Sequence, residues 1–139
     1  MIRRFKFDDL DAVMTLWLEG NLTAHNFIDK KYWHAKYRAV SQLLPSADVY
    51  VYEQDGVICA FAGVSEGYVN GIFVAGDMRS QGIGGQIIAE LKKIYGALSL
   101  RVYEKNHRAV KFYTRMGFHI ESIGVDSETG EKEYLMVCR

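Results

Sequence analysis

Runs of apolar, β-branched and aromatic residues, several of them alternating with polar positions, predict seven strands along this chain. They span residues 2–7, 48–53, 57–65, 68–74, 97–103, 118–125 and 133–138. Asp55-Gly56 and Glu66-Gly67 separate consecutive runs, which predicts tight turns between antiparallel strands. Gly71 lies inside the fourth run, where a glycine indicates a bulge or a close backbone approach.

Apolar residues recur every three or four positions in four further segments, which predicts amphipathic helices. These segments span residues 9–19, 32–44, 86–95 and 104–115. We expect Gly20 and Asn21 to end the first helix and Pro45 to stop the second. The loop at 22–29 carries apolar residues, so it must pack back onto the domain.

The predicted order of elements is β-α-α-β-β-β-α-β-α-β-β. Hairpins make the early strands antiparallel, whereas the helix at 86–95 crosses over and makes the strands at Phe73 and Leu100 parallel neighbours. The expected fold is α/β, with a mixed, mostly antiparallel central sheet flanked by helices. A chain of 139 residues with 49% apolar content and one Pro can bury the core of a single domain, residues 1–139.

A glycine-rich turn, Arg79-Ser80-Gln81-Gly82-Ile83-Gly84-Gly85, joins a buried strand to a helix. The first N–H groups of a helix have no internal partner and the dipole there is positive, so such a turn can hold phosphate. Gly82, Gly84 and Gly85 would let a pyrophosphate approach the backbone without a Cβ in the way. No Lys follows the glycines as in a P-loop, and the third glycine of a dinucleotide fingerprint is missing. From this stretch alone, a tight β–α turn without a ligand stays open.

Two motifs carry a resemblance to a known family. Arg79-x-x-Gly82-x-Gly84 resembles the coenzyme A pyrophosphate loop of the GNAT superfamily of N-acetyltransferases. Asn106-x-x-Ala109-x-x-Phe112-Tyr113-x-x-x-Gly117-Phe118 is similar to the second motif of that family. The resemblance is close over residues 68–118. Gly76 and Ser80 depart mildly from it, and neither removes an N–H group from the phosphate site.

The resemblance implies the acyl-CoA N-acyltransferase (GNAT) fold and direct transfer of acetyl from acetyl-CoA to a primary amine. The acceptor could be a small molecule, a peptide N-terminus or a protein lysine. Backbone amides at Gln81–Gly85 would hold the pyrophosphate, and a backbone N–H near Phe73 or Val74 would stabilise the oxyanion. The implied coenzyme-binding residues are Ile72, Phe73, Val74, Arg79, Ser80, Gln81, Gly82, Ile83, Gly84, Gly85, Asn106, Ala109, Phe112 and Tyr113.

The same resemblance makes Tyr113 the candidate general acid that protonates the leaving thiolate, with simple packing on the sheet as the alternative. Glu66, Glu104 and His25 all stay open as the general base, and Glu66 is the one that we predict to be catalytic. His25, Phe27 and Tyr68 are the expected acceptor contacts, although a His that only hydrogen-bonds its own loop is the other interpretation of His25.

The basic residues of the last predicted helix form either a solvated face or a contact to the 3′-phosphate of the coenzyme. They are Lys105, Arg108, Lys111 and Arg115. Net charge is zero, so no nucleic-acid partner is expected. There is no membrane-length apolar run and no leader-like N-terminus, so we expect a cytoplasmic protein.

Cys59 and Cys138 are far apart and fit two reduced thiols better than a disulfide or metal site, so no metal is expected. A homodimer stays open. Two other functions stay open as well. One is a module that binds acyl-CoA for regulation without turnover, and the other is a toxin-like transferase that acts on aminoacyl-tRNA.

Overall fold

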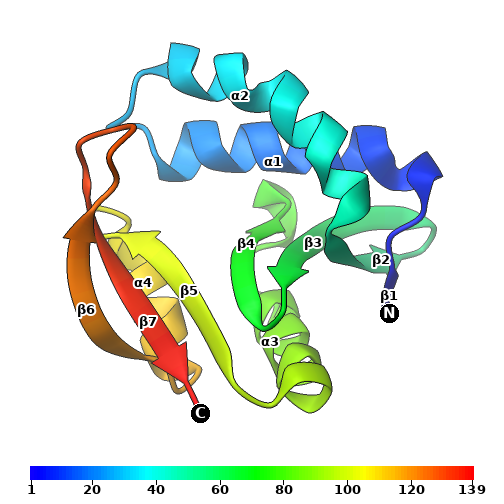
Figure 1. The fold of residues 1–139 in the computed structure, drawn as a ribbon. Coiled ribbons are helices and arrows are strands. Elements are labelled where there is room, and N and C mark those ends of the chain that lie inside the picture. Colours follow the sequence, from blue (N-terminus) through cyan, green and yellow to red (C-terminus); the bar gives the residue numbers. More distant parts are fainter.

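One seven-stranded sheet runs through the computed structural model, which describes residues 1–139, and four α-helices flank it (Figure 1). The strands are β1 (Ile2–Arg4), β2 (Asp48–Gln54), β3 (Val57–Ser65), β4 (Tyr68–Val74), β5 (Leu98–Tyr103), β6 (His119–Val125) and β7 (Lys132–Cys138). The helices are α1 (Leu10–Ala24), α2 (Lys30–Leu43), α3 (Ile83–Tyr95) and α4 (His107–Arg115). The strand order is β1-β2-β3-β4-β5-β7-β6, and every pair except β4–β5 is antiparallel, which confirms the predicted mixed sheet.

Alternate side chains of the central strands enter two separate cores, one on each face of the sheet. Val49 and Val51 of β2 pack with α1 and α2 on one face. Tyr50, between them in sequence, points to the other face and packs with Ile87 and Leu91 of α3. Each apolar side chain that is fully buried contributes about 1.5–3 kcal/mol, so this alternation fixes which helix covers which face. No helix combines the length and the apolar character that a membrane span requires.

β4 and β5 are parallel but paired only at their N-terminal ends. Tyr68 lies opposite Ser99 and Val69 lies opposite Leu100, and beyond these two positions the strands diverge, as Figure 1 shows. β4 also has the bulge predicted near Gly71, since Asn70 is left without a partner on β3. A bulge bends its strand. The prediction that the strands at Phe73 and Leu100 are parallel neighbours is confirmed, although Phe73 itself lies beyond the paired region.

The first helix extends past its predicted end. α1 continues through Gly20 and Asn21 to Ala24, and the connection to α2 is only His25–Asp29. A Cβ on Gly20 would lie 2.6 Å from the ring of Phe73, and a Cβ on Gly71 would also lie 2.6 Å from that ring. Gly20 therefore does not act as a helix cap. It makes room, together with Gly71, for Phe73 between α1 and β4.

Candidate functional site

A cleft of about 1090 Å³ opens where β4 and β5 diverge. This volume is at the upper end of the range for small-molecule sites, so the cleft suits a long ligand. The predicted site residues that line it are His25, Tyr68, Ile72, Phe73, Val74, Arg79, Ser80, Gly82, Ile83, Gly84, Gly85, Asn106, Ala109, Phe112 and Tyr113. Both sequence motifs thus meet in one cleft. Phe27, Glu66 and Gln81 do not line it.

The glycine-rich turn leads directly into α3. Gly82 is the N-cap residue and has a φ of 80°, a left-handed conformation that glycine adopts without strain. Ser80 is also left-handed, with a φ of 66°. The N–H groups of the first turn of α3 have no partner within the helix, and they lie at the positive end of the helix dipole beside the cleft. This arrangement can bind a pyrophosphate.

Gly84 and Gly85 lie close to α4 as well as lining the cleft. A Cβ on Gly84 would lie 3.0 Å from Cζ of Phe112 on α4, and a Cβ on Gly85 would lie 3.6 Å from Sδ of Met116. These two glycines therefore let α3 and α4 approach each other. The prediction that a side chain at Gly84 would also fill the place of the phosphate stays a prediction.

Tyr113 lies on the inner side of α4 and lines the cleft. Its ring packs edge-on against Phe112 and Phe118 at centroid distances of 5.2 and 5.5 Å. The side chain is 8% exposed, and its hydroxyl makes no hydrogen bond within the protein. Burial raises the pKa of Tyr113 above its ordinary value, so the phenol stays neutral and can donate a hydrogen bond at neutral pH.

A chain of hydrogen bonds links α1 to the start of α4 through His25. The Asn106 side chain caps α4 by accepting from the Ala109 N–H at 3.3 Å, and its amide nitrogen lies 3.2 Å from His25 Nε2. His25 Nδ1 lies 2.8 Å from Asn21 Oδ1, and the Asn21 amide donates to the Trp17 carbonyl at 2.9 Å. With the amides assigned in this way, Nε2 accepts and Nδ1 carries the proton.

His25 is therefore held as a neutral ring with both nitrogens occupied. Aromatic rings of Trp33, Tyr103 and Phe27 surround it at centroid distances of 5.4, 5.0 and 5.8 Å. Burial lowers the pKa of His25 to about 4. A proton relay or general base needs a free nitrogen that titrates in the working range, and His25 has neither property. The structure thus fits the interpretation in which His25 only hydrogen-bonds its surroundings.

This buried His25 predicts a pH dependence of stability. Its pKa is lower in the folded chain than in the unfolded chain, so its contribution is complete above about pH 6.5 and is lost as pH falls toward 4. Between pH 7 and pH 5 the free energy of unfolding should fall by about 2 kcal/mol from this residue. Urea unfolding at both pH values should show a smaller decrease in His25→Gln. His34→Gln, at an exposed position on α2, should behave like the parent, and equal decreases in all three proteins would contradict the prediction.

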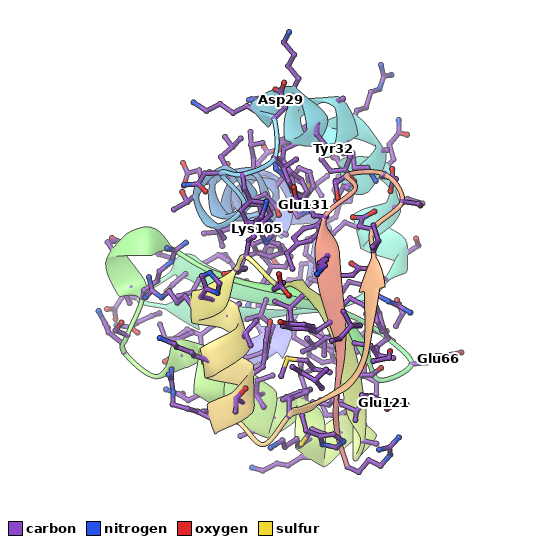
Figure 2. All side chains as sticks on the ribbon, turned by 90° about the vertical axis from the view of Figure 1, so that its left-hand side faces the viewer. Asp29, Tyr32, Glu66, Lys105, Glu121 and Glu131 are labelled. Atoms are coloured by element: carbon purple, nitrogen blue, oxygen red, sulfur yellow. The ribbon has the colours of Figure 1, made fainter.

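The two carboxylates that were candidates for the general base, Glu66 and Glu104, lie outside the cleft. Glu66 occupies an exposed turn between β3 and β4, with a φ of 51°, and Figure 2 shows it pointing away from the body of the protein. Glu104 accepts a hydrogen bond from the Tyr134 hydroxyl at 3.1 Å and does not line the cleft. The carboxylate that does line it is Glu133 of β7, which sequence reasoning missed.

Several basic side chains line the cleft. The Arg108 guanidinium lies 3.4 Å from the Ser80 hydroxyl, so it spans from α4 to the glycine-rich turn. Arg79 and Arg115 also line the cleft, whereas Lys111 does not. Lys105 lines it too, but its ammonium is paired with Glu131 at 3.0 Å, and Figure 2 shows these two side chains close together. Arg79, Arg108 and Arg115 are thus the cations best placed for a phosphate.

The β6–β7 hairpin extends toward α1 and α2 (Figure 1). Its turn reaches the connection between those helices in Figure 1. Glu128 in the turn pairs with Lys36 of α2 at 2.9 Å, and Asp126 accepts a hydrogen bond from the Tyr103 hydroxyl at 2.6 Å. These contacts connect the hairpin to α2 and β5.

Comparison with known proteins agrees with this geometry. Residues 45–120 match the family described as Acetyltransferase (GNAT) domain. The peptidyl-lysine N-acetyltransferase YiaC of Escherichia coli (strain K12) is 33% identical over 138 residues, which cover 98% of this chain and 94% of YiaC.

Solved structures share the fold. Apo-form YjaB from Escherichia coli aligns with a TM-score of 0.88 at 22% identity, over 99% of this chain and 95% of that chain. The structure of an acetyltransferase from Bacillus anthracis str. Ames in complex with acetyl coenzyme A aligns with a TM-score of 0.61 at 20% identity, over 67% of this chain and 62% of that one. The chain belongs to the GNAT acetyltransferase family, and it is an N-acetyltransferase that takes its acetyl group from acetyl-CoA and transfers it to an amine.

Proposed function

We propose that this enzyme acetylates the side-chain amine of lysine residues in proteins or peptides. The observation that carries the proposal is the likeness to YiaC, a peptidyl-lysine N-acetyltransferase, over almost the full length of both chains. A cleft that receives residues from α1 through β7 supports the further proposal that residues 1–139 act as a single catalytic domain.

Within this proposal, backbone and side chains share the task of holding acetyl-CoA. The N–H groups at the start of α3 bind the pyrophosphate, and Arg108 or another cleft arginine binds the 3′-phosphate. The backbone of Ile72, Phe73 and Val74, which line the cleft beyond the paired part of β4, holds the thioester, and an N–H from this segment binds its oxygen as negative charge develops. Fixing the thioester in this way places its carbonyl carbon for attack by the amine.

Tyr113 then acts on the sulfur. Its phenol has a pKa at or above about 10, and a thiol has a pKa near 8.5, so full proton transfer from Tyr113 to the thiolate is uphill. The hydroxyl therefore stabilises the developing thiolate mainly as a hydrogen-bond donor. It can pass on its proton if it takes another from the attacking nitrogen, so that no tyrosinate remains. Its lack of any other partner supports this role.

A matched set of acceptors tests the proposed function. Release of free coenzyme A should be measured with a peptide that has a blocked N-terminus and one lysine, and with the same peptide in which arginine replaces the lysine. We expect turnover with the lysine peptide alone, and mass spectrometry should place one acetyl group on the lysine.

Three other results would contradict the proposal in different ways. Turnover of only the free N-terminus or of a small amine would assign another acceptor. Acetyl-CoA binding without release of coenzyme A from any amine would indicate a regulatory binding module. Acetylation of aminoacyl-tRNA, with binding that weakens strongly as salt rises, would indicate the toxin-like transferase.

A further inference from the structure

Glu133 is the only carboxylate that lines the cleft. The other charged side chains around the cleft are basic: Arg79, Arg101, Lys105, Arg108 and Arg115. Glu133 lies on β7, opposite Tyr103 of β5 and Gly124 of β6. β5 contributes Arg101, Val102 and Tyr103 to the lining of the cleft, and Glu133 is the residue that β7 contributes. The single negative charge therefore comes from a different element than the N–H groups of α3 that are suited to phosphate.

The neighbouring carboxylates all have firm partners, and Glu133 does not. Glu104 accepts a hydrogen bond from the Tyr134 hydroxyl, Asp126 accepts one from the Tyr103 hydroxyl, and Glu131 forms an ion pair with Lys105. Glu133 accepts no side-chain hydrogen bond, and its one ion pair is with Arg101, whose Nε lies 3.9 Å from Oε1. A carboxylate with free acceptor positions can bind an ammonium group.

A second hollow, of about 250 Å³, meets the cleft at Glu133. It lies over β5, β6 and β7 and shares with the cleft only Arg101 and Glu133. Three of its seven lining residues are apolar, namely Ile123, Val125 and Leu135, and most of the surface that the lining exposes is polar. Because the hollow and the cleft meet at Glu133, an acceptor that lies in the hollow can present its ammonium group to Glu133.

We propose that Glu133 binds the ammonium group of the acceptor and accepts one of its protons before acetyl transfer. The inference rests on the proposed function, since it needs an acceptor that is charged at neutral pH. The carboxylate takes a proton from the ammonium group, which gives a neutral amine and a carboxylic acid. The amine nitrogen then forms a bond to the thioester carbon as the carbon–sulfur bond breaks. The proton that the new amide nitrogen loses passes to the thiolate through Tyr113, and Glu133 releases its proton to water.

The groups that face Glu133 are consistent with this role. Burial and the nearby charge of Asp126 raise the pKa of Glu133, and Arg101 on β5 opposes the shift. Tyr103 on β5 is neutral, because burial raises its pKa and its hydroxyl is bonded to Asp126. The remaining neighbour on β6, Gly124, carries no charge. A raised pKa of the carboxyl group lies closer to the pKa of the amine, which is near 10.4. Proton transfer from the ammonium group to Glu133 is therefore less unfavourable.

Glu133→Gln tests the proposal, with the amine that the parent enzyme turns over best as the acceptor. At neutral pH we expect kcat/KM for the acceptor to fall by about tenfold to hundredfold, while calorimetry shows unchanged acetyl-CoA affinity. Between about pH 6 and pH 10 the variant should gain activity as the amine loses its own proton, so that its profile rises more steeply than that of the parent. Glu133→Asp should retain part of the activity.

Glu121→Gln is the matched control. Glu121 lies on β6 and pairs with Arg139 at 3.3 Å, and Figure 2 shows it far from Glu131 and the turn end of the hairpin. It should match the parent in rate and profile. A Glu133→Gln profile parallel to that of the parent, or a rate within threefold of it, would overturn the proposal. If the best acceptor is not a lysine peptide, the proposed function fails, and the same comparison still tests Glu133 with the other amine.

Discussion

Tyr113→Phe should lower kcat by roughly 10² to 10⁴, the usual effect of losing a group that donates a hydrogen bond or a proton to a reacting atom. The ring keeps its packing against Phe112 and Phe118, and the hydroxyl that is removed has no partner in the protein. Stability should therefore change little. Acetyl-CoA affinity should also stay nearly constant, because the hydroxyl acts when negative charge develops on the sulfur.

Steady-state kinetics with a saturating acceptor measures the effect of Tyr113→Phe on kcat, and calorimetric titration with acetyl-CoA measures its effect on coenzyme affinity. Tyr95→Phe provides a matched control, since Tyr95 lies at the end of α3 outside the cleft and its hydroxyl bonds to Tyr50 at 3.0 Å. That variant should keep the parent rate. A Tyr113→Phe enzyme within a fewfold of the parent would mean that Tyr113 only packs, and a joint loss of rate and affinity would make it an anchor for the coenzyme.

The pattern of the chain is sufficient to predict the strands, the helices and the coenzyme side of the cleft. Each strand and helix has its own local signal, and the two motifs lie on consecutive elements that a β-α-β crossover must bring together. The predicted residues from Ile72 to Gly85 therefore lie together along one cleft, apart from Gln81, which is exposed. Local signals do not predict the point at which β4 and β5 separate. The two strands pair at only two positions and then diverge, and this depends on the geometry of the whole sheet.

The acceptor side was harder to predict for a related reason. Glu133 reaches the cleft because β7 inserts between β5 and β6, a non-local pairing that no spacing in the sequence indicates. Glu66 was chosen for its closeness in sequence to β4, but it lies in a turn at the paired end of β4, away from the opening. The role of His25 could not be assigned from the sequence either. Its hydrogen-bond partners are Asn21 on α1 and Asn106 at the cap of α4, and Asn106 is far from His25 along the chain.

Gly84→Val should weaken acetyl-CoA binding by about tenfold to hundredfold and lower the free energy of unfolding by about 1–3 kcal/mol. The reason is contact between helices. A Cβ at this position would lie 3.0 Å from Cζ and 3.4 Å from Cε1 of Phe112, and the two further methyl groups of valine add to the crowding. Inserting bulk into a packed contact costs energy of this size. Moving α4 away from α3 would also displace Asn106 and Phe112 from the cleft wall.

A second substitution decides whether this explanation is correct. Phe112→Leu removes the ring atoms that the new side chain meets. Gly84→Val should therefore cost less stability and less acetyl-CoA affinity in the Phe112→Leu background than it costs in the parent. Contacting residues are expected to show such coupling in a double-mutant cycle. Urea unfolding and calorimetric titration of the four proteins measure it. If the two losses simply add, the valine does not act through Phe112. If stability recovers while affinity stays low, the side chain at position 84 occupies the space of the pyrophosphate, and the N–H groups of α3 are blocked directly.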